Sequence, residues 1–306
     1  MDKNQYLNRL IESGECRFDK LEINGVDNTR LRYLLDEMIE GETSFFHRDV
    51  SYGDDYFDIL HSYICEGLSK NRGAPVVRFA DGEYAFYENN LHCNGLYEQA
   101  ESIEAISKAM PIHRKALGNL SQTGKIASVI YPGNTQRKRN SLSSFFCKSK
   151  GDDSALRFLN FLFENQTELT NDNYLPFFVV YAYLTSKRFR QVMDGKNLCI
   201  INSECNINSC RKWFARFSSH PNITFTEIAD SYVATRWETM KEDIINRIPP
   251  DTELCLVGAG VGALLVCVDV AHKFSIPALD AGHVLNMMND YENKSNGPRL
   301  YTIWKS

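Results

Sequence analysis

Val76-Val77-Arg78-Phe79-Ala80-Asp81-Gly82-Glu83 is a short apolar run that ends abruptly in two carboxylates on either side of a glycine. Such a run predicts a buried strand whose carboxyl end opens into a turn, and ligands collect at that edge of open α/β sheets. Asp81 and Glu83 are two residues apart, so in an extended backbone their side chains would share a face. Gly82 would let the chain bend closely around a ligand. Oxygen ligands on one face suit a hard divalent cation, which usually carries the phosphates of a nucleotide.

The same octapeptide also fits a plainer interpretation. Asp81-Gly82 is an ordinary turn dipeptide, and strand ends commonly carry solvated acids. Taken alone, the motif is therefore more typical of an exposed turn than of a metal site.

Apolar runs that end in turn residues or a polar switch recur along the chain, and each predicts a further strand. They cover residues 126–130, 198–201, 223–228, 254–257 and 276–279. Helix-length segments separate several of them, at 207–218, 232–247 and 261–273. Strands that alternate with helices form βαβ units and a mostly parallel sheet. We therefore predict an α/β, Rossmann-like fold with a mostly parallel sheet and flanking helices.

Two segments fall outside this alternation. Residues from about 28 to 70 look helical, and one apolar stripe predicts an amphipathic helix packed against the sheet: Tyr56, Phe57, Leu60, Ile64 and Leu68. Residues 145–193 are rich in aromatic side chains and predict a helical insertion that covers the ligand edge, with its aromatics mainly in the core. We expect an N-terminal helical extension over residues 1–72 and a Rossmann-like domain over 73–306.

The composition is that of a soluble globular protein, with 43% hydrophobic and 24% charged residues in a chain of 306. A formal net charge of -5 argues against a nucleic-acid partner, and the basic cluster Arg137–Arg139 is too short for a polyanion track. No secretory signal is visible at the polar N-terminus, so we expect a cytoplasmic location. The longest apolar stretch, Leu254–Ala271, contains three glycines and Asp269, so it predicts strand, turn and helix, not a membrane span.

The cysteines and histidines do not predict a zinc site. The nine cysteines contain no Cys-x-x-Cys pair, and the seven histidines are scattered. Cys199, Cys255 and Cys267 sit inside apolar runs, so free core thiols are expected.

A second candidate site is the glycine-rich turn Gly258-Ala259-Gly260-Val261-Gly262, which follows a predicted strand and opens a predicted helix. Glycines at a helix N-terminus let backbone amides approach a phosphate or a ribose. With Asp280 about 20 residues further on, the turn would equally suit a dinucleotide or S-adenosylmethionine, where the acid binds a ribose hydroxyl. Tight packing of the helix on the strand is an alternative reason for the glycines.

A third candidate is Ala278-Leu279-Asp280-Ala281-Gly282-His283, another strand end that carries an acid, a glycine and a histidine. Histidine titrates near neutrality and can transfer protons in catalysis, although a single histidine is equally compatible with a structural role.

These motifs carry a family resemblance. Arg78-Phe79-Ala80-Asp81-Gly82-Glu83 resembles the Arg-Phe-Gly-Asp-Gly-Glu signature of the GT-D type glycosyltransferases, a family once classed as a domain of unknown function. Gly258-Ala259-Gly260 and its helix, followed by Asp280-Ala281-Gly282-His283, resemble that family's Gly-Pro-Thr helix and Asp-Ile-Gly-His pair. Ile200-Ile201-Asn202-Ser203-Glu204 resembles its Val-Glu-Gly-Glu strand end. The resemblance extends loosely from residue 75 to residue 292.

This chain departs from the family pattern at three places. Ala80 replaces a glycine, Asn202 stands where the family has its first acid, and Val261-Gly262 replaces Pro-Thr. The change at Asn202 leaves Glu204 as the acid of that strand end.

The resemblance implies a metal-dependent glycosyltransferase that moves a hexose from a nucleotide diphosphate sugar, with a UDP-sugar expected, to a glycan or glycoprotein acceptor with inversion. It assigns Mn²⁺ or Mg²⁺ to Asp81 and Glu83, because a divalent cation stabilises the charge of a departing nucleoside diphosphate. The other expected contacts are Arg78 for the diphosphate or the acidic pair, the turn of Gly258, Gly260 and Gly262 for the nucleotide, and Asp280, Gly282 and His283 for the ribose or donor sugar. For the catalytic base we expect Glu204 first and His283 second.

Two alternatives stay open from the sequence. A Rossmann enzyme that depends on S-adenosylmethionine or NAD would use the glycine turn and Asp280, and would have no use for Asp81 and Glu83. A non-catalytic nucleotide-sugar-binding relative would account for the replacements at Ala80 and Asn202.

Overall fold

The structure is a computed structural model, and it describes residues 43–45, 55–93, 97–128, 161–162, 164–167, 169, 172–289 and 302–304. The Arg137–Arg139 cluster, the predicted helical region before residue 55 other than 43–45, and the first part of the predicted insertion lie outside these residues.

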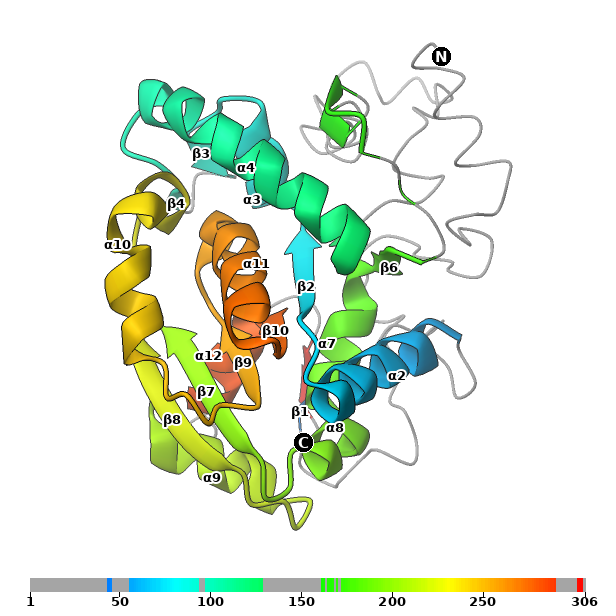
Figure 1. Cartoon of the computed structure of the whole chain (residues 1–306). Helices are drawn as coiled ribbons and strands as arrows, with labels where there is room; N and C mark the ends of the chain where they lie inside the picture. Colours follow the sequence, from blue (N-terminus) through cyan, green and yellow to red (C-terminus); the bar gives the residue numbers. More distant parts are fainter. Residues whose placement is uncertain are drawn as a thin grey trace, which may run out of the picture.

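A sheet of seven parallel strands forms the centre of the described structure, in the order β6-β5-β2-β10-β9-β7-β8 (Figure 1). Its members are β2 (Ala74–Phe79), β5 (Lys125–Ser128), β6 (Tyr174–Pro176), β7 (Asn197–Asn202), β8 (Asn222–Glu227), β9 (Leu254–Val257) and β10 (Pro277–Asp280). All the strands predicted from apolar runs are present, so the α/β prediction with a mostly parallel sheet is confirmed.

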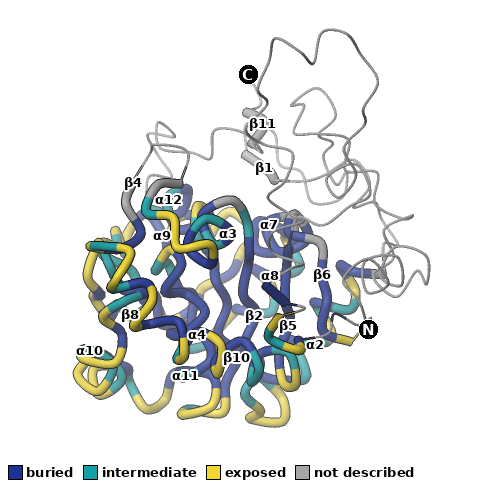
Figure 2. Tube along the Cα trace, turned by 90° about the horizontal axis from the view of Figure 1, so that it is seen from above, coloured by how far each residue is buried: buried dark blue, intermediate teal, exposed yellow. Residues whose placement is uncertain are grey.

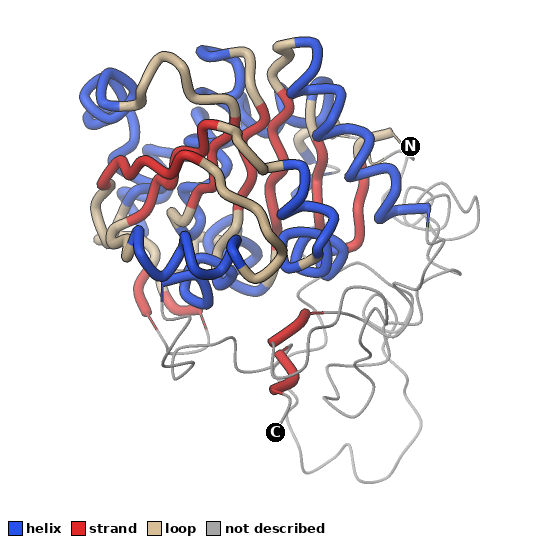
Figure 3. Tube along the Cα trace, turned by 90° about the horizontal axis from the view of Figure 1, so that it is seen from below, coloured by secondary structure: helices blue, strands red, loops and turns tan. Residues whose placement is uncertain are grey.

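Helices cover both faces of this sheet (Figure 3). One layer consists of α4 (Ile103–Thr123), α10 (Val233–Arg247) and α11 (Ala263–Phe274), which pack against one another. The other contains α2 (Asp55–Lys70), α7 (Phe177–Thr185), α8 (Lys187–Val192), α9 (Ile207–Ala215) and α12 (His283–Asn289). The short elements are α3 (Asp81–Tyr87), η5 (Gly260–Gly262) and two antiparallel strand pairs, β3 (His92–Cys93) with β4 (Tyr97–Glu98) and β1 (Thr43–Phe45) with β11 (Thr302–Trp304).

The helix α2 packs as its apolar stripe predicted. Tyr56, Phe57, Leu60 and Ile64 are buried, and the helix contacts α7 together with β2, β6 and β10. The N-terminal extension therefore includes an element that covers the sheet.

The predicted insertion differs from expectation in one element. Its described part is helical over α7 and α8, but Tyr174–Pro176 forms β6 and adds a parallel strand beside β5. A run of three residues is too short for its periodicity to predict a strand. The insertion thus adds an outer strand to the sheet, and its helix α7 packs against β2, β5 and β6.

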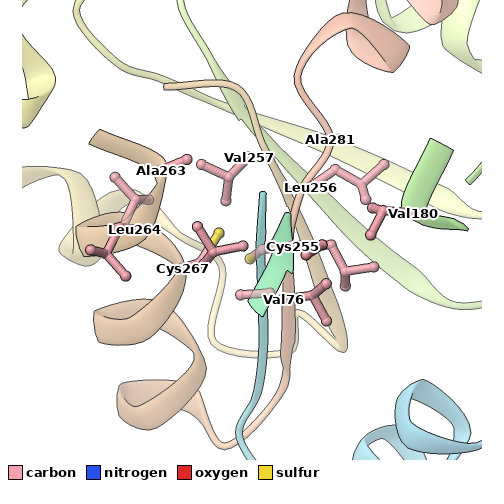
Figure 4. Close-up of a cluster of buried hydrophobic side chains, with 14 of the residues drawn as sticks. Val76, Val180, Cys255, Leu256, Val257, Ala263, Leu264, Cys267 and Ala281 are labelled. Atoms are coloured by element: carbon pink, nitrogen blue, oxygen red, sulfur yellow. The ribbon is translucent and has the colours of Figure 1, made fainter. Parts of the chain in front are cut away.

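The core surrounds the central strands, which are buried along their length (Figure 2). Cys255 and Val257 of β9 lie on the side of Leu264 and Cys267 of α11, whereas Leu256 lies on the other side, near Val180 (Figure 4). These residues are at most 1% exposed. Cys199, Cys255 and Cys267 are free and buried, which confirms the prediction of core thiols. Across the residues that the structure describes, no helix is both long and apolar enough to cross a bilayer.

Candidate functional site

The candidate site lies between two neighbouring strands at the centre of the sheet, β2 and β10. The chain after β2 leads to α4 in one helix layer, whereas the chain after β10 leads to α12 in the other layer. Ligands of open α/β sheets bind outside the carboxyl ends of strands whose connections part in this way. The pairing of β2 with β10 ends at Val76 and Leu279, while β10 stays paired with β9 up to Asp280 and Val257. The two central strands therefore part just before their carboxyl ends.

The topology brings the predicted site segments to one edge of the sheet. Asp81 and Glu83 follow β2, Asp280 to His283 end β10, the glycine turn follows β9, and Glu204 follows β7. These four strands are consecutive neighbours and parallel, so their carboxyl ends lie side by side. Segments far apart in the sequence are thus adjacent in space.

An ion pair joins the first and last of these segments across the gap. Arg78 Nη2 donates to Asp280 Oδ1 at 2.7 Å, and Arg78 Nε donates to the Asp280 carbonyl oxygen at 2.9 Å. The backbone N–H of Arg78 donates to Asp280 Oδ2 at 3.3 Å. Arg78 is 8% exposed and Asp280 is 3% exposed. Beyond the last paired residues of β2 and β10, the Asp280 carboxylate thus accepts a backbone N–H of β2 in place of a backbone carbonyl of β10.

Position 282 must be a glycine, because a side chain there would overlap Arg78. The φ of Gly282 is +42°, in the left-handed region that side chains other than glycine rarely adopt. A Cβ atom on Gly282 would lie 1.9 Å from Arg78 Nη2. Burial disfavours the charge of Arg78, but the neighbouring Asp280 carboxylate and the Tyr181 oxygen outweigh it, so the pKa of Arg78 lies above its ordinary value.

The predicted geometry of Asp81 and Glu83 is wrong in one respect, because the chain turns helical at Asp81. Asp81 is the first residue of α3, so the extended backbone assumed for Asp81-Gly82-Glu83 is absent. Glu83 instead reaches back to the start of its helix, where its Oε2 accepts the Ala80 N–H at 2.8 Å. The side chain of Asp81 lies outside the described part of the structure.

The carboxyl group of Glu83 is held in a poorly hydrated place. Burial, with the nearby Asp280 carboxylate as a further contribution, raises the pKa of Glu83 to about 7, while the Ala80 N–H and Arg78 oppose the rise. Glu83 is partly buried, and a cation would stabilise the ionised form of such a carboxyl.

The described residues contain no group of three or more His, Cys, Asp or Glu side chains arranged to hold a metal ion. A magnesium or manganese ion that binds a substrate phosphate needs fewer protein ligands than this. One or two carboxylates suffice when water and phosphate oxygens complete the coordination.

Close packing explains two glycines of the turn after β9. A Cβ on Gly258 would lie 2.6 Å from Asn202 Oδ1, and one on Gly262 would lie 2.6 Å from Val233 Cγ1. Gly260 differs, since it is exposed and has a φ of +52°. The packing interpretation therefore holds for the outer glycines, and Gly260 is the one that faces solvent.

The two candidate bases are exposed on the same edge. Glu204 follows β7, and His283 opens α12. The Glu204 carbonyl oxygen accepts from Asn202 Nδ2 at 3.0 Å and from Asn289 Nδ2 at 3.1 Å. These bonds fix the Glu204 backbone to the end of α12.

Comparison with known proteins gives similarity at the level of structure. No family model and no curated protein matches this chain. Two solved structures of the domain of unknown function 1792 are similar to it. One is a selenomethionine-substituted structure that is 17% identical, over 79% of this chain and 87% of that chain, with a TM-score of 0.45. The other is described as having a distinct glycosyltransferase fold and is 16% identical, with the same coverage and a TM-score of 0.45.

Sequence reasoning missed three residues at the site. Tyr181 and Phe177 of α7 contact Arg78, and the buried Gln99 accepts the Val261 N–H at 3.4 Å through its Oε1. Phe177 and Tyr181 are four apart and so share a helix face, but an apolar run surrounds them and is typical of core. No motif in the sequence distinguishes Gln99.

Proposed function

We propose that this protein is a metal-dependent glycosyltransferase. It moves a hexose from a nucleotide diphosphate sugar, with a UDP-sugar as the expected donor, to a hydroxyl of a glycan or glycoprotein, and it inverts the anomeric configuration. The observation that carries the proposal is the Arg78–Asp280 ion pair, because it joins the first and last motifs of the resemblance at the carboxyl ends of β2 and β10. A cytoplasmic place in polysaccharide biosynthesis belongs to the same proposal.

The metal ion would be Mn²⁺ or Mg²⁺, held by Asp81 and Glu83. When bound, it would stabilise the negative charge that develops on the departing nucleoside diphosphate. The high pKa of Glu83 supports this assignment, because a nearby divalent cation would relieve the cost of ionising a partly buried carboxyl.

The other residues would bind and orient the two substrates. Arg78 would supply a fixed positive charge near the diphosphate, and its rigid surroundings mean that little reorganisation accompanies the reaction. Gly260 would let the backbone approach the nucleotide, and Gly282 and His283 would line the ribose or donor sugar. The acceptor hydroxyl needs a base within hydrogen-bond reach, and the exposed Glu204 is our first candidate, with His283 second.

The contacts of Asp280 disfavour a dinucleotide or S-adenosylmethionine enzyme. In that case Asp280 would bind a ribose hydroxyl, but its carboxylate is buried against Arg78. The same contacts correct our expectation that Asp280 binds the ribose or donor sugar of a glycosyltransferase donor.

Calorimetric titration with UDP, with and without Mn²⁺, tests the proposal. We expect Mn²⁺ to strengthen UDP binding at least about tenfold, or about 1.4 kcal/mol. The double variant Asp81→Ala/Glu83→Ala should lose this metal effect, whereas Glu88→Ala, which removes an exposed acid just after α3, should keep it.

Metal-dependent binding that survives in Asp81→Ala/Glu83→Ala would contradict the site, and preferential binding of NAD or S-adenosylmethionine would contradict the class of enzyme. Slow hydrolysis of one member of a panel of UDP-sugars would then establish activity without knowledge of the acceptor. Hydrolysis of none would favour a protein that binds a nucleotide sugar without acting on it.

A further inference from the structure

The helix α7 brings two aromatic rings to the Arg78 guanidinium. Phe177 and Tyr181 lie one helical turn apart, with their rings at 86° and their centroids 5.1 Å apart. Arg78 Cζ lies 5.2 Å from the centroid of the Phe177 ring and 4.6 Å from that of Tyr181. Both rings are buried, at 5% and 2% exposed, so these cation–π contacts are shielded from water.

The Arg78 guanidinium forms hydrogen bonds with two elements, Asp280 at the end of β10 and Tyr181 of α7. Asp280 accepts from Nε and Nη2, which fixes one edge of the planar guanidinium. The remaining terminal nitrogen, Nη1, donates to the hydroxyl of Tyr181. Gly282 closes the space next to Nη2. Tyr181 is therefore the residue of α7 that fixes the orientation of the edge that Asp280 does not hold.

A phenylalanine would pack in the same place as Tyr181 without burying a hydroxyl. Burying a hydroxyl costs free energy unless it forms hydrogen bonds, and the bond to Arg78 contributes to the compensation for this oxygen. Burial also raises the pKa of Tyr181 to about 12, which keeps the phenol neutral at physiological pH. The hydroxyl can thus contact a cation without adding a second negative charge beside Asp280.

We propose that Tyr181 is a positioning residue for the transfer reaction: it holds the Arg78 guanidinium against Asp280 at the gap between β2 and β10, and so fixes the direction of the positive charge toward the donor diphosphate. This inference rests on the proposed function. It gives the helical insertion a role in substrate binding, since the insertion supplies the residue that holds Arg78.

The test compares Tyr181→Phe with Tyr183→Phe. Tyr183 is the matched control, because it is also a buried tyrosine of α7 but its hydroxyl contacts His61 Nδ1 at 3.2 Å. We expect Tyr181→Phe to weaken UDP binding in the presence of Mn²⁺ about tenfold, as for loss of a hydrogen bond to a charged group. The ¹⁵N resonance of the Arg78 Nε–H should shift in the same variant, and Tyr183→Phe should change neither quantity.

A double-mutant cycle with Arg78→Lys separates positioning from general stability. If Tyr181 acts through the guanidinium, Tyr181→Phe should weaken UDP binding in the wild-type background and have little further effect in Arg78→Lys. Additive losses, or equal losses in Tyr181→Phe and Tyr183→Phe, would overturn the inference. So would unchanged UDP binding in Tyr181→Phe, whatever the Arg78 resonance does.

The two proposals fail in different ways. Wild-type protein that binds no UDP with any divalent metal would overturn the proposed function, and the inference with it. Wild-type protein that binds UDP in a metal-dependent way, with Tyr181→Phe binding it equally well, would overturn the inference alone. If Tyr181→Phe fails to fold, Phe177→Leu replaces it in the cycle, since that change removes the other ring beside Arg78 and should act in the same direction.

Discussion

At the scale of single residues, Arg78 connects most of the candidate site. It is tied to Asp280 by its side chain and its backbone N–H, it lies against Phe177 and Tyr181, and it leaves no room for a side chain at Gly282. A buried pair of this kind is costly to disturb, because removing one partner leaves an uncompensated charge in the interior.

Gly282→Ala should therefore destabilise the protein by about 2–4 kcal/mol, because a Cβ would both strain the backbone and overlap Arg78 Nη2. Gly118→Ala is the matched control: Gly118 is inside α4, and a Cβ there would meet nothing within 4 Å. That change should stabilise the protein by about 0.5–1 kcal/mol. Urea unfolding measures both, and an unchanged free energy of unfolding in Gly282→Ala would contradict the packing described for Arg78.

At the scale of elements, His113 links three helices beside the site. The residue is fully buried in α4, where its Nε2 donates to the Ala234 carbonyl oxygen of α10 at 2.9 Å and its Nδ1 accepts from the Tyr87 hydroxyl of α3 at 3.2 Å. Both ring nitrogens are occupied in a neutral ring. Burial lowers the pKa of His113 from 6.5 to about 4, against the opposing effect of the Ala234 carbonyl.

Acid should therefore destabilise this junction before carboxylates of ordinary pKa become protonated. Below pH 6.5 the unfolded histidine takes up a proton that the folded one does not bind until about pH 4. The free energy of unfolding should thus fall as the pH is lowered across this window, by about 3 kcal/mol in total from this residue.

The measurement is the difference in unfolding free energy between wild type and His113→Gln as a function of pH. The variant should be less stable at pH 7 but lose less stability on acidification, so the two curves should converge toward pH 4. Parallel curves would contradict a neutral buried His113.

The elements also show why some of the structure could be predicted and some could not. Strands such as β9 were predictable because four apolar residues in succession precede a glycine-rich turn. The helix α3 was not, because Asp81-Gly82 favours a turn, and the signal for a helix was the glutamate three residues after Ala80, which caps the N-terminus. Tyr181 was hidden because nothing in an apolar helix distinguishes a ring that contacts a cation from one that only fills space.

At the scale of the whole molecule, the order of the strands determines which motifs meet. The sequence predicted which segments would end at the ligand edge, but periodicity does not specify strand order, so the pairing of β2 with β10 could not be derived from it. The contact between Arg78 and Asp280 follows from that pairing.

The pairing of β2 with β10 also has a consequence for biosynthesis. Arg78 and Asp280 are separated by 202 positions in the chain, and the partner of β2 on this side is among the last strands to be made. Contacts this distant in sequence close large loops, which is slow and entropically costly. One side of β2 therefore stays without its neighbouring strand until β10 has been synthesised, near the end of translation. A truncated nascent chain that stops before β10 would lack both the central pair of the sheet and the Arg78–Asp280 contact of the candidate site.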